Sequence, residues 1–416
     1  MKHILIIGGG AAGLSAAACA AESGARVTVL EANPRIGGNG LFAEEMFGLG
    51  TAFQEAQGVH CDLDGYFRLS MEHSHYKNNA RLVRRLLEKS GENLNWLMDH
   101  GLKIAGLQPD STGFGPVTHF TEGMHTGRDV MAVLIRFCQN HPLIEIHTRT
   151  KVLRLLTDDA GGVTGAETDQ NTFTADGVVM ACGGFGGNPE LIHRLIPGTD
   201  ETAFAHRRGI RSAGNGILLA ESVGAELLQD CCFENAGPTF AGDQRIMTLV
   251  TKRYALWLNS QGRRFADESV GDNFVFGCNA VYAQPGHKCY VVLDQAMVQE
   301  ALNGPVDFLA GPEANAMGTT GIQAAIEKEQ GKGTVMLCDS LQEMADFMGA
   351  PPEGLQAEIE AYNRFCADGR DPIFLKPGEL LRPVAHGPYL CIRCGVDYIL
   401  THGGLRVDET MNVLRG

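Results

Sequence analysis

The sequence predicts an α/β protein that opens with a parallel strand–helix–strand unit, and its first residues carry the observations that support this class. An apolar run at residues 3–7 has the length of a buried strand. A turn at 8–13 with the pattern G-x-G-x-x-G then leads into a helix of small residues at 14–21. A second apolar run at 27–30 ends on Glu31. This combination is typical of the βαβ unit that binds dinucleotides.

Each residue type in this unit has a physical role. Gly8 permits the tight turn, Gly10 lets the backbone approach a pyrophosphate, and Gly13 allows the helix to pack closely on the strand. The free N–H groups at the start of the helix, around Ala12, present a partial positive charge to phosphates. Glu31 can accept hydrogen bonds from ribose hydroxyls and would repel a 2′-phosphate.

The loop after Glu31 indicates which dinucleotide is bound. Residues 31–39 read E-A-N-P-R-I-G-G-N and resemble the E-x(5)-GGN pattern of FAD-binding flavoproteins. The chain is similar to the fumarate reductase/succinate dehydrogenase flavoprotein family, which also includes 3-ketosteroid Δ1-dehydrogenases and urocanate reductase. The resemblance implies FAD as cofactor, with further contacts from Ala32, Gly38 and Asn39.

The segment from 144 to 184 extends the resemblance. Short strands are predicted at 144–147, 151–156, 163–168, 172–175 and 178–181. Members of the family insert a three-stranded meander before a strand that ends in A-x-G-G, which reads Ala181-Cys182-Gly183-Gly184 in this chain. The resemblance implies FAD contacts from Val152, Ala181 and Gly183.

Two helix starts follow in the order that the family shows. Residues 185–190 resemble a G-F-x-x-N-x-E helix start, and residues 212–217 resemble a T-G-D-G-I stretch whose acid contacts FAD. In this chain Asn215 replaces that acid. Because an asparagine can still accept a hydrogen bond, the resemblance implies the same contact from Asn215.

The order of these motifs predicts the domain organisation. We expect a Rossmann-like FAD-binding domain at 1–235, an inserted α+β capping domain at 236–385, and a return to the FAD-binding domain at 386–416. Within the first domain, the apolar spacing predicts a helix at 79–100 with a break near Gly91, a glycine-rich loop at 106–127 and a helix at 129–138.

The resemblance also implies the type of reaction. An FAD enzyme of this family moves a hydride between the flavin and a substrate carbon, while a protein acid or base handles the proton on the neighbouring carbon. The candidates for that group are His402, Tyr254, Tyr398 and Arg253. His402 lies in a T-x-G-G turn that approaches the flavin in the family, and the alternative is a turn histidine without chemistry.

The cations that hold a dicarboxylate in family fumarate reductases are missing from this chain. The family's H-P-T reads Gly237-Pro238-Thr239, the expected arginine falls near Asp272, and a histidine pair reads Ile399-Leu400. Fumarate is therefore an unexpected substrate, and a less charged conjugated substrate with an activated C–C or C=C bond fits better. Two alternatives stay open: a ketosteroid Δ1-dehydrogenase-like enzyme, or a flavin-binding protein without catalysis.

One further histidine and one pair of charged residues have more than one interpretation from the sequence. His119 falls where relatives carry a histidine, so it either faces the substrate or is a solvent-facing loop residue. Arg264 and Glu268 are four residues apart, and we expect them to form a structural ion pair at the domain junction.

Composition restricts the partners. The formal net charge of -15 argues against nucleic acid or an anionic membrane surface. No apolar run is long enough to span a bilayer, and because the cofactor motif begins at residue 3 we expect no signal peptide. The 12 cysteines do not resemble a secreted disulfide framework, so a cytoplasmic setting is expected. We expect a small-molecule substrate and a separate electron donor or acceptor.

The remaining motifs concern bound groups. Residues 40–51 contain no histidine for covalent flavin attachment, so FAD should bind non-covalently. Cys391-x-x-Cys394 lies in strand-like sequence without a second such pair, so we expect no metal. Members of the family continue past G-G-L-x-x-D-x-x-x-x-V-L into a further flavin-binding segment, whereas the printed sequence stops at Gly416. A longer natural chain and a flavin site without that segment are the two alternatives.

Overall fold

The computed structural model describes residues 1–110, 112–123, 125–200, 203–207, 212–306, 310, 314 and 317–416. The chain divides into two compact units, each considered on its own below. Unit 1 comprises Met1–Ile196, Arg211–Cys231 and Gly403–Gly416, and unit 2 comprises Pro197–Ile210 and Cys232–His402. The α/β class predicted from the sequence is confirmed.

Unit 1 is built on a parallel sheet in the order β10-β1-β2-β6. Its strands are β1 (His3–Ile7), β2 (Arg26–Leu30), β6 (Ile144–His147) and β10 (Gly177–Met180). In the register of the sheet, Ile6 lies opposite Val29 on one side and Val179 on the other. The expected strand–helix–strand unit is therefore present, with β1 and β2 as direct neighbours.

Alternate residues of β1 face opposite sides of this sheet, and each side is covered by different elements. Ile6 belongs to a core with helices α1 (Ala11–Glu22) and α5 (Thr126–Asn140). Leu5 and Ile7 belong to a second core that includes the meander strands β7 (Val152–Thr157), β8 (Val163–Thr168) and β9 (Thr172–Thr174). The predicted three-stranded meander is confirmed, since β7, β8 and β9 form their own antiparallel sheet.

The other elements of unit 1 correct two expectations. The expected break at Gly91 is wrong, because α4 (Ala80–Asp99) is continuous and a side chain at Gly91 would collide with the Leu49 carbonyl. The segment 106–127 is not only a loop: β5 (Thr118–Thr121) pairs with β3 (Met46–Phe47) and β4 (Ile104–Leu107). The remaining helices of this unit are η1 (Gly38–Phe42), α2 (Ala52–Ala56), α3 (Leu63–His73), α6 (Pro189–Leu195) and α7 (Asn215–Glu221).

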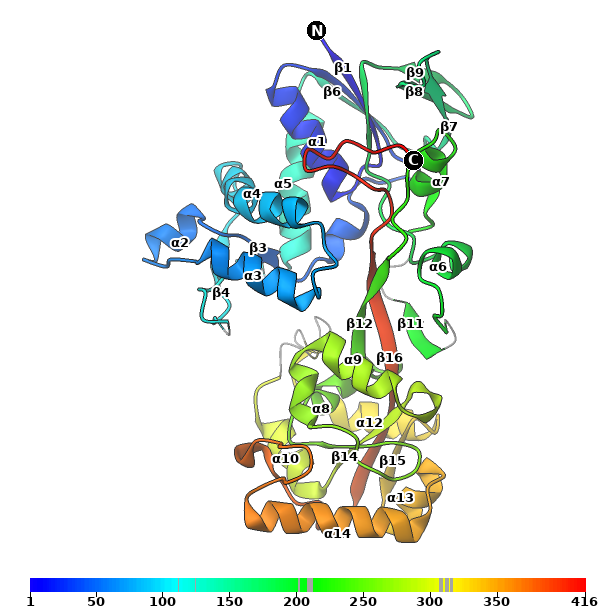
Figure 1. Ribbon diagram of the computed structural model, residues 1–416. Coiled ribbons are helices and arrows are strands. Elements are labelled where there is room, and N and C mark those ends of the chain that lie inside the picture. The colour runs from blue at the N-terminus through cyan, green and yellow to red at the C-terminus, as the bar shows by residue number, and fades with distance from the viewer. Residues whose placement is uncertain are drawn as a thin grey trace. The chain divides into compact units, whose positions relative to one another are not determined.

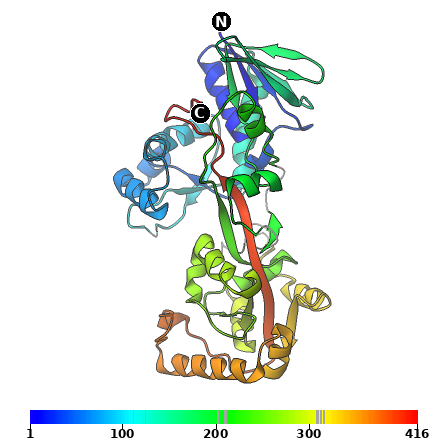
Figure 2. The ribbon, with the colours of Figure 1, turned by 45° about the vertical axis from the view of Figure 1, so that its right-hand side comes forward.

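Unit 2 is organised by one long strand, β16 (Tyr389–His402), which Figures 1 and 2 show in red. Its first half pairs with β14 (Cys289–Leu293) and β15 (Val335–Cys338). Its second half pairs with β11 (Phe204–Arg207) and β12 (Cys232–Thr239). Because β16 continues without interruption, unit 2 extends to His402, and the return expected at residue 386 falls inside this unit.

Helices and one short strand complete unit 2. They are α8 (Met247–Val250), β13 (Leu256–Leu258), α9 (Phe274–Tyr282), α10 (Gln295–Asn303), α12 (Ile322–Gln330), α13 (Leu341–Met348), α14 (Pro352–Asp368) and the 3-10 helices η3 (Gln244–Ile246), η4 (Glu268–Asp272), η5 (Pro285–His287) and η7 (Gly378–Leu380).

A buried cluster of charges lies inside unit 2. Arg264 Nη2 is 2.9 Å from Glu268 Oε2 and 3.0 Å from Asp371 Oδ2, and Lys376 Nζ is 3.1 Å from Glu268 Oε2. All of these side chains are at most 1% exposed. The Arg264–Glu268 pair is thus structural, as expected, but it lies within unit 2 and has two additional members.

Removing one charge from this cluster should be costly. In Glu268→Ala, Arg264 and Lys376 would share Asp371 as the remaining anion, and two cations would stay buried. We expect the free energy of unfolding to fall by about 3–5 kcal/mol, measured by urea denaturation with tryptophan fluorescence. Glu167→Ala, which breaks the exposed Arg154–Glu167 pair, is the control and should cost about 1 kcal/mol or less. A loss below that control value for Glu268→Ala would contradict the interpretation.

Candidate functional site

The turn after β1 has the shape that a pyrophosphate requires. Gly8 has φ +112°, and a side chain there would collide with the Ala181 carbonyl; a side chain at Gly13 would collide with the carbonyl of Gly8. Gly10 differs, because no atom lies within 4 Å of the position that its Cβ would take. Gly8 and Gly13 therefore serve packing, whereas Gly10 borders open space.

Hydrogen-bond donors face this space at the start of α1. The first helical hydrogen bond runs from the Leu14 N–H to the Gly10 carbonyl at 3.0 Å. The N–H groups of the residues before Leu14, including that of Ala12, therefore have no partner within the helix. A phosphate above Gly10 would receive these donors together with the positive end of the helix dipole.

Glu31 connects the turn to the loop that follows β2. Its Oε2 accepts a hydrogen bond from the Gly9 N–H at 2.8 Å, and its Oε1 accepts from the backbone and side-chain nitrogens of Asn33 at 2.7 and 2.8 Å. An ionised carboxylate has about four acceptor positions, so one position stays available to a ribose hydroxyl.

The loop itself is held against the turn. The Gly37 N–H donates to the Gly9 carbonyl at 2.8 Å, and the ideal Cβ position of Gly38 is 3.3 Å from the Cα of Gly10. Ala32 and Asn39 are exposed beside it. The residues predicted from the E-x(5)-GGN pattern thus lie together around Gly10.

The later cofactor candidates come to the same end of the sheet. Ala181 follows β10 and its N–H donates to the Ile7 carbonyl at 2.8 Å, and Gly183 has φ +80°. Asn39 Nδ2 donates to Ser212 Oγ at 3.2 Å, just before α7, which begins at Asn215. The side chain of Val152 is buried, so its backbone is the part left for a ligand. Gly10, the first N–H groups of α1 and the carboxylate of Glu31 border one open space, which we call the cradle. Its free N–H donors and its carboxylate fit the pyrophosphate and ribose of FAD, and this arrangement defines a dinucleotide-binding protein.

Comparison with known proteins identifies the family. The family model described as FAD binding domain matches residues 3–416, and the chain belongs to this family. It is 28% identical over 99% of its length to a vinyl phenol reductase of Lactiplantibacillus plantarum, covering 86% of that protein. It is 26% identical, again over 99% of its length, to a fumarate reductase (cytochrome) of Shewanella frigidimarina, covering 68% of that protein.

A solved structure supports the fold. The chain is similar over its full length to a 3-ketosteroid Δ1-dehydrogenase from Sterolibacterium denitrificans, with 18% identity, a TM-score of 0.77 and 91% of that chain covered. With the family established, the chain is an FAD-dependent oxidoreductase, and its relatives include reductases of small substrates.

His402 lies at the exposed end of β16. It is opposite Cys232 in the register with β12, and its Nε2 is 3.4 Å from Oε2 of Glu234. Its side chain is 56% exposed. Glu234 was missed by sequence reasoning, because only the register of β12 against β16 brings this carboxylate beside the histidine.

Tyr398 lies four residues earlier on β16 in different surroundings. It is fully buried, and its ring stacks on Phe233 with ring centroids 4.4 Å apart. The rings of Tyr398 and Phe204 pack edge to face, with centroids 5.1 Å apart. That Tyr398 transfers a proton to a substrate stays a prediction, and its ring packs against the two phenylalanines.

Tyr254 and Arg253 lie before β13. The Tyr254 hydroxyl donates to the Met297 carbonyl at 3.4 Å, and burial raises the pKa of this phenol, so it keeps its proton. Arg253 Nε is 2.5 Å from Asp272 Oδ1. Tyr254 contacts α10 and has the Arg382 guanidinium over its ring, whereas Arg253 contacts η4. His402 contacts β12, so its surroundings differ from those of Tyr254 and Arg253.

His119 is not the solvent-facing loop residue that one interpretation expected. It is fully buried on β5, where its Nδ1 is 3.0 Å from the Val117 carbonyl and its Nε2 is 2.9 Å from Thr51 Oγ1. Burial lowers the pKa of this imidazole, which therefore stays neutral at physiological pH. The histidine links β5 to the start of α2.

Among the residues that the structure describes, no group of three or more His, Cys, Asp or Glu side chains is arranged to hold a metal ion. Over the same residues, no helix has both the length and the apolar character needed to cross a membrane. Cys391 and Cys394 are buried in β16, and burial raises the pKa of both thiols.

Proposed function

We propose that this protein reduces the C=C bond of a small, uncharged conjugated substrate of the vinyl phenol type and does not reduce fumarate. The proposal rests on what surrounds the positions where the family places the cations that hold a dicarboxylate. Any side chain at Gly237 would begin 2.9 Å from the Cα of Cys278, so a histidine has no room there.

The other positions agree with this proposal. Asp272 is an acid where a cation is expected, and it pairs with the nearby Arg253. Ile399 is half-buried and Leu400 is 43% exposed, so the position of the family's histidine pair is apolar in this chain. A dianion at these positions would meet the Arg253–Asp272 pair, which carries no net charge, and apolar groups, whereas an uncharged alkene would lose little solvation there. The relative with 28% identity is named for a vinyl phenol, which supports the same substrate class.

In the proposed reaction, one alkene carbon receives a hydride and the other receives a proton. FAD, when bound and reduced, supplies the hydride. We propose that His402 holds the proton that is transferred, with Glu234 beside its imidazole. Tyr254 and Tyr398 are the alternative donors. A separate electron donor must reduce the flavin for each turnover.

The compartment is part of the proposal. All 12 cysteines are free thiols, and Cys19 and Cys232 are exposed. Exposed thiols persist where the surroundings are reducing, so we propose the cytoplasm.

The substrate proposal predicts a charge-dependent set of activities. With viologen-reduced, flavin-loaded protein, we expect turnover of 4-vinylphenol in the ordinary range of about 1–1,000 per second and no measurable reduction of fumarate. Dimethyl fumarate has the same double bond without the charges and serves as the matched control. If dimethyl fumarate is reduced while fumarate is not, the result would support the proposal that the site excludes fumarate because of its charge. Rapid fumarate reduction would refute the proposal.

A further inference from the structure

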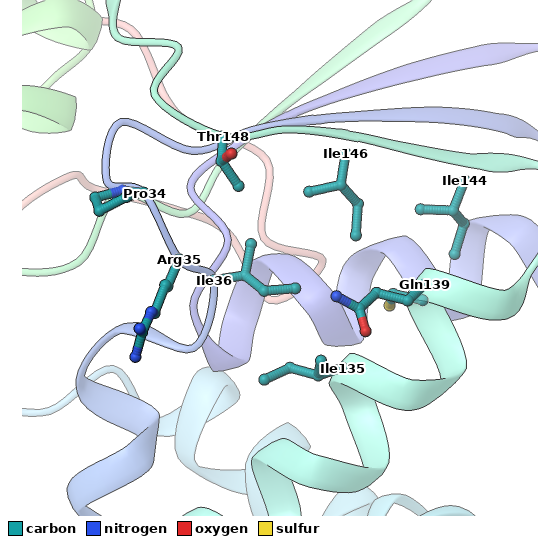
Figure 3. Close-up of a pocket in the computed structure, with 9 residues that line it drawn as sticks. Pro34, Arg35, Ile36, Ile135, Gln139, Ile144, Ile146 and Thr148 are labelled. Atoms are coloured by element: carbon teal, nitrogen blue, oxygen red, sulfur yellow. The ribbon is translucent and has the colours of Figure 1, made fainter.

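A cavity lies in unit 1, and the loop after Glu31 separates it from the cradle at Gly10. Its volume is about 520 Å³, within the range of small-molecule sites. It opens on the side of the sheet that α5 covers, between that helix, β6 and the loop after Glu31 (Figure 3). The residues that line it are Pro34, Arg35, Ile36, Ile135, Cys138, Gln139, Ile144, Ile146 and Thr148.

The lining combines an apolar floor with polar groups at the edge. Figure 3 shows Ile36, Ile144 and Ile146 directed toward the space above Ile135 of α5. The polar members are Arg35, Gln139 and Thr148, all exposed, and no lining residue is acidic. In the described part of the chain Arg35 forms no ion pair. A ligand with an apolar body and one negative charge matches this arrangement.

The cavity and the FAD cradle share the loop from 31 to 38. Ile36 packs directly against the glycine turn, since a Cβ on Gly9 would come within 2.7 Å of Ile36 Cγ2. The next residue, Gly37, donates its N–H to the Gly9 carbonyl, and Gly9 in turn donates to Glu31. The loop from 31 to 38 thus has the cavity on one side and the cradle on the other.

We propose that this cavity binds a small aliphatic carboxylic acid and that its occupation strengthens FAD binding. The carboxylate pairs with Arg35 at the edge of the cavity, and the alkyl body contacts the isoleucines. A ligand that packs against Ile36 stabilises the loop in the conformation that holds Gly37 and Glu31 against the turn. Linkage then requires FAD and the acid to favour each other equally. The proposal rests on FAD binding and is independent of the substrate.

The test uses 4-methylpentanoate and its neutral amide as probes, with binding measured by isothermal titration calorimetry. We expect saturable binding of the acid and about tenfold weaker binding in Arg35→Gln, because a charge-assisted hydrogen bond is lost. The amide should bind both proteins equally. Arg26→Gln removes an exposed arginine at the other end of β2 and should leave binding unchanged.

A second variant tests the location, and a second measurement tests the linkage. Gln139 is an exposed residue of α5, so Gln139→Trp should fold and place a large side chain in the cavity, abolishing binding. Saturating acid should lower the FAD dissociation constant of the apoprotein about fivefold or more, followed by flavin fluorescence. Absence of saturable binding, or binding that both variants leave unchanged, would overturn the site. Binding without any change in FAD affinity would overturn the linkage.

Discussion

Gly10→Val should yield a folded protein that contains no flavin. The position that a side chain would take at Gly10 has no neighbour within 4 Å, so valine can be accommodated without displacing protein atoms. The same open space is where the pyrophosphate must approach the start of α1. The branched side chain should therefore exclude the cofactor, and oxidoreductase activity should be lost with it. Flavin absorbance of the purified protein and its circular dichroism spectrum are the measurements.

A second glycine provides the control for Gly10→Val. Gly106 on β4 also has no neighbour within 4 Å of its Cβ position, and it lies outside the cradle. Gly106→Val should retain both fold and flavin. By contrast, Gly13→Val should fail to fold normally, because its side chain meets the Gly8 carbonyl. Full flavin occupancy in folded Gly10→Val would refute the assignment of the cradle.

His402→Ala should lower turnover by about 10²–10⁴-fold, the usual contribution of a general acid, while FAD binding stays intact. The side chain is more than half exposed, so its removal should cost about 1 kcal/mol of stability or less. Both kcat and kcat/KM should fall, because the proton is transferred only as the transition state forms. Steady-state reduction of 4-vinylphenol, with flavin content measured in parallel, provides these values.

His386→Ala is the matched control for this variant, because His386 is also an exposed histidine of unit 2. It should retain wild-type turnover. If His402→Ala does the same, the catalytic assignment is wrong, and Tyr254 and Tyr398 become the candidates to test. Tyr254→Phe is then the informative variant, since it removes only the hydroxyl that bonds to Met297.

Local patterns predicted the cofactor half of the molecule well. The strands expected at 144–147 and 163–168 coincide with β6 and β8. Asn188, expected at a helix start, accepts a hydrogen bond from the Leu191 N–H at the beginning of α6. These features depend on neighbours a few residues away, so the sequence contains nearly all the information that they need.

Expectations failed where the deciding contact comes from a distant segment. Gly91 suggested a break because glycine weakens a helix, yet its missing side chain allows close approach of the Leu49 carbonyl. One of the two interpretations of His119 placed it in a solvent-facing loop, but its pairing with Met46 and its bond to Thr51 bury it. Neither contact is visible in a local pattern.

FAD binding can be inferred from the sequence alone, since the turn at 8–13 and the loop at 31–39 are short contiguous segments whose shape depends on glycine and one acid. The surroundings of the other candidates emerge only when the chain is folded. The tertiary fold places Glu234 beside His402, Phe233 against Tyr398, and Asp371 beside Arg264. Strand register and core packing bring these partners together from remote positions in the sequence, and no local preference specifies them.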